Sequence, residues 1–132
     1  MQLINTSEAP GAIGPYVQGY VVNGFVFTSG QIPVNPADGT VPEGISAQAE
    51  QSCKNVAAVL KAGGSDIGKV IKTTCFLADM GDFAAFNEVY ARDDTDRSCK
   101  RNRYISSAGL KDRKKRHRIG QARQLTAVIP AV

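Results

Sequence analysis

An Asn-Gly pair at residues 23 and 24 limits the fold of this chain more than any other feature. It separates two short apolar runs, residues 20–22 and 25–27. Both members of the pair accept the positive φ angles of a type I′ turn, so the pattern predicts a tight antiparallel hairpin. Because a two-residue loop fixes the register, Tyr20 is expected opposite Phe27.

The same register places polar side chains at the open end of the hairpin, with Gln18 opposite Ser29. Because side chains alternate along a strand, four of them are expected on one face: Tyr16, Gln18, Ser29 and Gln31. Gly30 follows Ser29, and a residue without a side chain lets a ligand approach the backbone. This polar corner is a candidate binding site.

Hydrophobic periodicity predicts the next elements. A short strand is expected near residues 3–6. Apolar residues recur every three or four positions over residues 45–60, which is typical of an amphipathic helix. Ser46 is its expected cap, and Gly63-Gly64 its expected end. Residues 70–77 are rich in β-branched side chains and predict a strand.

A second helix is predicted over residues 80–92, with Asp79 as its cap. Its inner face is expected to carry Asn87 among three aromatic side chains, Phe83, Phe86 and Tyr90. A buried amide without a partner costs ~1–3 kcal/mol, so Asn87 is expected either to bond nearby backbone in the core or to brace a loop of the site. Together the elements predict an α+β fold, in which two helices cover one face of a mixed β-sheet.

The charge distribution divides the chain, although 132 residues favour a single domain. Residues 1–96 hold five Lys/Arg and eleven Asp/Glu, whereas residues 97–132 hold eleven Lys/Arg and one Asp. Residues 97–132, the basic segment, are therefore an atypical part of the predicted domain 1–132. They are either a basic binding tail or a segment foreign to the domain that precedes them.

Cysteine and histidine usage argues against metal chemistry. The three cysteines lie more than twenty residues apart, at 53, 75 and 99, which suits neither a disulfide framework nor a zinc site and favours a reducing, cytoplasmic location. Since His117 is the single histidine, no metal and no other cofactor is expected. Residues 1–5 show no secretion signal, and no apolar run approaches the length of a membrane span.

Residues 9–18 and 28–33 resemble the two signature segments of the RidA/YjgF family of reactive-intermediate deaminases, and residues 76–90 match a third. The likeness runs from residue 1 to about residue 91. It implies a chorismate-mutase-like fold and a homotrimer with active sites between subunits. It also implies hydrolytic deamination of enamine/imine intermediates, such as 2-iminobutanoate and 2-iminopropanoate, to 2-ketoacids and ammonia.

The resemblance also implies roles for particular residues. Those that bind substrate or form the pocket would be Tyr16, Ser29, Gly30, Asn87 and Arg97. Arg97 would hold the substrate carboxylate, for which a planar guanidinium is suited. The main-chain carbonyl of Cys99 would contact the reacting nitrogen.

Beyond residue 91 the chain departs from the family pattern. Residues 92–96 replace two aromatics, and Arg97-Ser98-Cys99 comes several residues early. A last strand is predicted over residues 124–129, but it has no carboxylate, and Thr126 is nearest to the family glutamate that activates water. A threonine hydroxyl is no base near neutral pH, so weakened hydrolysis is expected. A shifted reading frame is an alternative that an intact mass matching all 132 residues would exclude.

The competing functional class is binding without this chemistry. Residues 111–118 are a basic run that suits phosphate neutralisation, although within the basic segment only Tyr104 offers a ring for stacking on bases. Nucleic-acid binding of this kind weakens steeply with salt. Regulatory or chaperone-like binding is a third possibility, favoured by the missing glutamate.

Overall fold

The computed structural model describes residues 1–93, 102–106 and 122–130. Its strands are β1 (Gln2–Ile4), β2 (Gly19–Val22), β3 (Phe25–Thr28), β4 (Lys72–Leu77), β5 (Asn102–Ser106) and β6 (Ala122–Pro130). Its helices are α1 (Ile45–Ala62) and α2 (Phe83–Asp93), with two short 3-10 helices, η1 (Ile67–Lys69) and η2 (Met80–Asp82).

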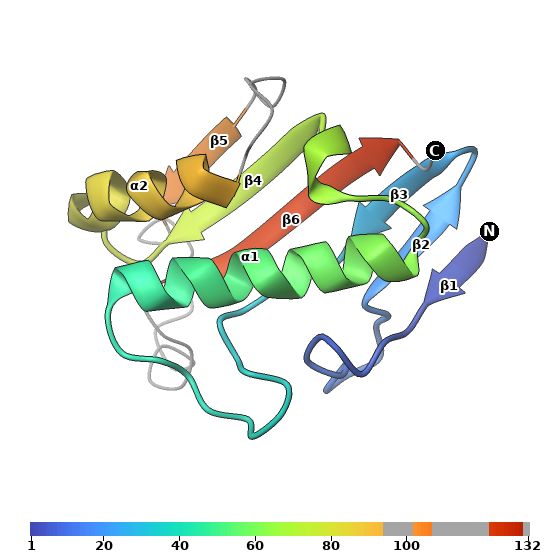
Figure 1. Ribbon diagram of the computed structural model, residues 1–132, viewed down its shortest axis with the longest axis horizontal. Helices are drawn as coiled ribbons and strands as arrows, with labels where there is room; N and C mark the ends of the chain where they lie inside the picture. The colour runs from blue at the N-terminus through green and yellow to red at the C-terminus, as the bar shows by residue number, and fades with distance from the viewer. Residues whose placement is uncertain (94–101, 107–121, 131–132) are drawn as a thin grey trace.

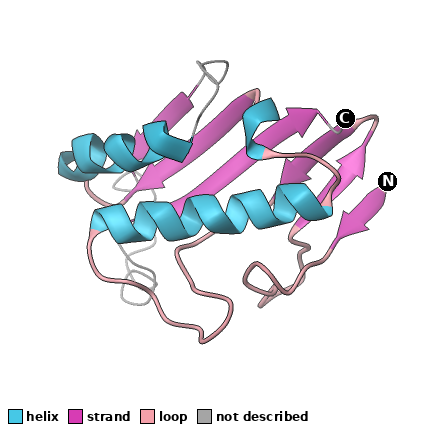
Figure 2. Ribbon diagram, in the orientation of Figure 1, coloured by secondary structure: helices cyan, strands magenta, loops and turns pink. Residues whose placement is uncertain are grey.

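The strands form one sheet in the order β1-β2-β3-β6-β4-β5. The β4–β5 pair is parallel and the other neighbouring pairs are antiparallel, so the sheet is mixed. Figures 1 and 2 show α1 and α2 side by side on one face of this sheet. The predicted α+β class is confirmed, and the strand predicted over residues 124–129 exists as β6, between β3 and β4.

The hairpin has the predicted turn and register. Asn23 and Gly24 have φ angles of 50° and 75°, the positive values that a type I′ turn needs. Tyr20 pairs with Phe27, and their rings stack with centroids 5.6 Å apart. The local sequence pattern was sufficient here because both the turn and the pairing lie within one short segment.

Helix α1 packs closely on the hairpin because Gly19 has no side chain. A Cβ placed there would lie 2.7 Å from the carbonyl oxygen of Phe27 and 3.2 Å from a methyl group of Val59. Val59 and Val26 are both fully buried, in the core that the helices share with the sheet. The glycine therefore sets the distance between α1 and the strands beside the candidate site.

Two predicted boundaries of the first half are corrected. Gly44, with a φ of 81°, is the N-cap of α1 and no side chain caps it, so the prediction of Ser46 as the cap is wrong. The predicted end is confirmed, since Gly63 is the C-cap and Gly64 has a positive φ of 79°. The strand predicted from residue 70 begins at Lys72, because η1 runs to Lys69 and Val70 is its C-cap.

The second helix is divided into η2 and α2, and Asp79 caps η2 by accepting a hydrogen bond from the backbone N–H of Gly81. The predicted inner face is wrong for two residues, since Phe83 and Asn87 are exposed. The buried residues of α2 are Phe86, Val89 and Tyr90. Positions 83 and 87 lie beside that stripe, because positions 86, 89 and 90 already span the contact with the core.

In the described ranges, no helix combines the length and the apolar character that crossing a bilayer requires.

Candidate binding site

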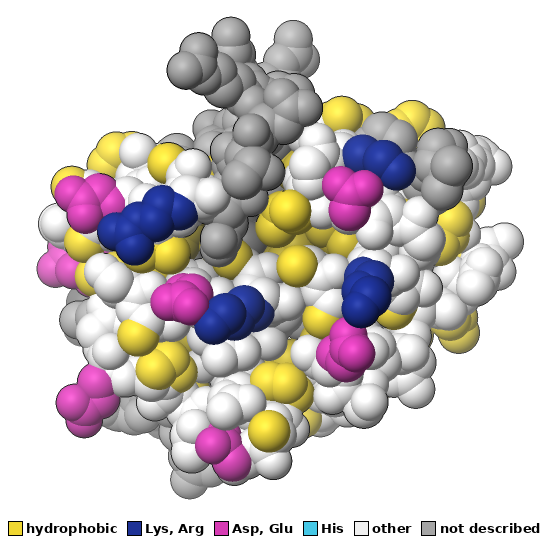
Figure 3. All heavy atoms as spheres, viewed as in Figure 1, with side chains coloured by type: hydrophobic (Ala, Val, Ile, Leu, Met, Phe, Trp, Pro, Cys, Tyr) yellow, Lys and Arg dark blue, Asp and Glu magenta, His cyan; other side chains and the backbone are white. Residues whose placement is uncertain are grey.

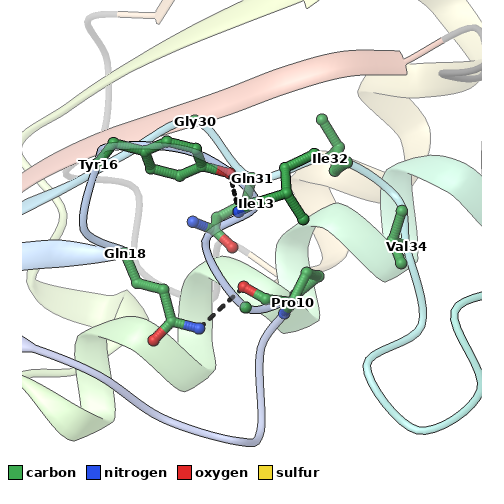
Figure 4. A pocket seen from close by; sticks show the side chains of 9 residues that line it. Pro10, Ile13, Tyr16, Gln18, Gly30, Gln31, Ile32 and Val34 are labelled. Atoms are coloured by element: carbon green, nitrogen blue, oxygen red, sulfur yellow. Dashed lines mark hydrogen bonds between the residues drawn. The ribbon is translucent and has the colours of Figure 1, made fainter.

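A cavity of about 130 Å³ lies beside the open end of the hairpin. Its lining comes from the loop before β2 and the loop after β3, as Figure 4 shows. The lining residues are Pro10, Gly11, Ile13, Tyr16, Gln18, Gly30, Gln31, Ile32 and Val34. Pockets for drug-sized ligands have volumes of about 300–1,000 Å³, so this cavity suits a ligand of a few heavy atoms.

Tyr16 contributes a hydroxyl group to an otherwise largely apolar wall. Its side chain is 50% exposed, and its hydroxyl accepts a long hydrogen bond of 3.4 Å from the backbone N–H of Ile13. Figure 4 shows the ring lying across the cavity, with this hydroxyl directed toward the loop that carries Ile13. A long bond at an exposed position is weak, so the hydroxyl can exchange it for a ligand.

Gln31 is the second polar group, and its amide nitrogen donates to the carbonyl of Ser29 at 3.2 Å. Ser29 itself is beside the cavity but is not among its lining residues. The backbone N–H of Ser29 donates to the carbonyl of Gln18 at 2.9 Å, and its hydroxyl donates to the carbonyl of Val17. Ser29 thus joins the two strands, while Gly30 faces the ligand space.

The structure brings together only part of the predicted site. Tyr16 and Gly30 share one cavity, whereas Asn87 is exposed on α2 and does not line it. Arg97 and Cys99 lie outside the described residues, as does the basic run 111–118. The roles assigned to these residues stay predictions.

The backbone of Thr126 is placed in β6, where it pairs with Thr74 of β4. In the described part of the chain, no three His, Cys, Asp or Glu side chains gather in a way that would hold a metal ion. Among the described residues, the cavity lining offers a ligand the phenol of Tyr16 and the carboxamide of Gln31 but no charged group, since the amide of Gln18 is engaged by the preceding loop.

The sequence did not predict that two buried amide side chains, those of Gln18 and Asn55, hold the walls of the cavity. Gln18 was expected at the site, but not as the partner of a preceding loop, and Asn55 was not singled out. Asn55 is a polar residue among the apolar positions of α1, and this pattern could have drawn attention to it. In the structure this residue is only 1% exposed. A buried amide requires partners, so its position alone indicated a contact with another segment.

A small mixed sheet with two helices on one face, and a cavity at the end of its first hairpin, places the protein in the class of small α+β domains. Comparisons with known proteins identify its family. The family model described as "Endoribonuclease L-PSP" matches residues 6–109. A "RutC family protein" of Haemophilus influenzae is 53% identical over 91 residues, covering 69% of this chain and 70% of the relative.

The chain belongs to the RidA/YjgF family. The "2-iminobutanoate/2-iminopropanoate deaminase" of Escherichia coli strain K12 is 52% identical over 87 residues, which are 66% of this chain and 68% of the relative. The crystal structure of E. coli TdcF with bound serine superposes with a TM-score of 0.83 and 36% identity over 98% of both chains. Both the predicted family and its fold are confirmed.

Proposed function

We propose that this protein hydrolyses reactive enamine/imine intermediates of the 2-iminobutanoate and 2-iminopropanoate class to 2-ketoacids and ammonia. The observation that carries the proposal is the small cavity in which Tyr16 and Gly30 meet, in a chain that is 52% identical over 87 residues to a relative named for this reaction. The bound serine in the TdcF structure is an amino acid similar in size to these imino acids.

The reaction needs little covalent chemistry from the protein. Water adds to the carbon of the C=N bond, the C–N bond then breaks, and ammonia leaves as the C=O bond of the ketoacid forms. The protein has to hold the carboxylate, orient the imine and admit one water, and positioning alone can supply several orders of magnitude in rate. In the proposed arrangement Arg97 binds the carboxylate and the main-chain carbonyl of Cys99 contacts the nitrogen.

Slow turnover follows from the absence of a glutamate in β6. A positioned general base contributes about 10²–10⁴-fold in rate, and a threonine hydroxyl does not act as one near neutral pH. Thr126→Glu is therefore expected to raise kcat at least tenfold at pH 7.5, while Thr126→Gln, which has the same shape but no basic group, leaves it unchanged. Equal rates for both variants would show that the lost carboxylate does not limit this enzyme.

We also propose that the protein is a homotrimer whose sites are completed by a neighbouring subunit. Leu3, Tyr20 and Phe25 are 59%, 37% and 39% exposed. Their strand positions alternate with the residues buried beneath the helices, so they lie on the open face of the sheet. An apolar surface of this kind marks a protein interface. Light scattering should give three times the 14.0 kDa of one chain.

A coupled assay tests the enzymatic proposal. A dehydratase acting on threonine or serine generates the imine, and the rate of ketoacid formation is measured with and without this protein. Acceleration is expected, and its absence with the purified chain would refute the proposal. Arg97→Ala should abolish the acceleration, whereas Lys61→Ala, which removes a positive charge from an exposed position of α1, should not.

Binding of nucleic acid is the second candidate, since the basic segment carries eleven Lys/Arg and the matching family model is described as an endoribonuclease. The helix face gives it no support, because acidic and basic side chains are interspersed there (Figure 3), as in the Lys54–Glu50 pair at 2.7 Å. RNA binding that falls steeply between 50 and 200 mM salt, without any deaminase activity, would favour this candidate.

A further inference from the structure

One wall of the cavity is held by the side chain of Gln18, which is only 2% exposed. Its amide oxygen accepts from the backbone N–H of Thr6 at 2.6 Å. Its amide nitrogen lies 2.9 Å from the carbonyl of Thr6, 3.2 Å from that of Ala9 and 2.9 Å from that of Pro10. Figure 4 shows the last of these bonds, directed from the hairpin into the loop that continues to the cavity.

The opposite wall is held by Asn55 of α1. Its amide nitrogen donates to the carbonyls of Ile32 and Val34, each at 2.9 Å, and both of these residues line the cavity. Its amide oxygen accepts from the amide nitrogen of Gln51 at 2.9 Å, which fixes the orientation of the Asn55 amide. One helix side chain thus fixes two carbonyls of the same loop.

We propose that Gln18 and Asn55 are a pair of positioning residues that set the width of the cavity and thereby the rate of the proposed reaction, an inference that rests on the proposed function. Neither loop belongs to a helix or strand where it meets the cavity. Without the amides, the carbonyls of each loop would bond to water in several alternative conformations. Displacement of a reacting group by about 1 Å can cost about a hundredfold in rate.

Gln48 provides a matched control on the same helix. It is buried, and its amide nitrogen donates at 2.9 Å to the carbonyl of Pro42, which lies farther along the same loop as Ile32 and Val34 but does not line the cavity. Asn55→Leu, Gln18→Met and Gln48→Met each replace a buried amide by an apolar side chain of similar size. All three remove hydrogen bonds from loop carbonyls, but only the first two release a wall of the cavity.

The experiment measures kcat, KM and backbone hydrogen exchange for the full-length chain and its three variants. Gln18→Met and Asn55→Leu should lower kcat about 10- to 100-fold with a smaller change in KM, while Gln48→Met stays within about twofold. Exchange should rise over residues 5–12 in Gln18→Met and over residues 32–35 in Asn55→Leu. If Asn55→Leu does not fold, Gln51→Ala, which removes only the orienting bond, replaces it.

If the unmodified chain is active and kcat is unchanged in both Gln18→Met and Asn55→Leu, the inference is overturned. An equal loss of kcat in Gln48→Met would also overturn it. If the unmodified chain shows no deaminase activity, the proposed function fails and hydrogen exchange alone decides. Faster exchange confined to the two cavity loops would then support the positioning role, and unchanged exchange would overturn it.

Discussion

The hydrogen bond between Tyr90 and Thr73 should contribute measurably to stability, because it joins α2 to the sheet within the core. The two hydroxyl oxygens lie 2.8 Å apart, and the residues are 8% and 3% exposed. Tyr90→Phe and Thr73→Val are each expected to cost about 1–3 kcal/mol, since each leaves a buried hydroxyl with one bond fewer. The double variant should cost less than their sum, by a coupling energy of about 0.5–1.5 kcal/mol.

Urea unfolding at a fixed protein concentration measures this coupling, since the stability of an oligomer depends on concentration. With a slope of about 2 kcal/mol per molar urea, 1 kcal/mol moves the midpoint by about 0.5 M. Tyr16→Phe, at a position that is 50% exposed, is the matched control and should change stability by less than about 0.5 kcal/mol. Additivity of the two core substitutions within about 0.3 kcal/mol would refute the reasoning.

Three further predictions concern the hairpin, the cavity and an exposed turn. Gly19→Ala should cost about 1–3 kcal/mol in urea unfolding, because its Cβ would lie 2.7 Å from a backbone oxygen of β3, whereas Gly11→Ala meets no atom within 4 Å and should be neutral. Tyr16→Phe should lower kcat/KM about tenfold in the coupled assay while leaving stability unchanged, since a ligand hydrogen bond of ~1.4 kcal/mol is a tenfold effect; wild-type activity would contradict this. Hydrogen bonds from the backbone and hydroxyl of Thr40 hold the pKa of Asp38 below 3.8, so its small stabilising effect is present near neutral pH and is lost as the pH falls through that lowered pKa. A carbon-13 NMR titration midpoint above 3.8 for Asp38 would disprove it.

The parts of the fold that the sequence predicted correctly depend on neighbouring residues. The Asn23-Gly24 turn, the pairing of Tyr20 with Phe27 and the end of α1 at Gly63 all follow from local φ angles and short-range pairing. The predicted inner face of α2 was partly wrong because the apolar residues of this helix are compatible with two neighbouring stripes. Packing on the sheet selects the stripe with Phe86 and Tyr90.

The site was predictable where it coincides with the hairpin and not where distant segments meet. Tyr16 and Gly30 follow from the register, which places both at its open end. The amide of Gln18 bonds a loop eight to twelve residues earlier, and Asn55 bonds carbonyls twenty-one and twenty-three residues away. The hydrophobic periodicity of a sequence does not indicate hydrogen-bond partners that lie this far apart in the chain. The hydroxyl of Ser29 likewise bonds the backbone of Val17, which alternation alone does not indicate.

In the C-terminal third of the chain, the residues that the fold requires differ from those that the proposed reaction requires. Sequence likeness to the deaminase relative covers 66% of the chain, whereas likeness in fold to TdcF covers 98%. A central strand needs only residues compatible with pairing on both sides, and β6 meets that need between β3 and β4. In the proposed reaction a carboxylate on that strand would activate water, and residues 122–130 contain none. On the proposed function, the chain keeps the sheet and the cavity of this family while turning over slowly, so a low kcat that rises in Thr126→Glu is the result that would decide between enzyme and binding protein.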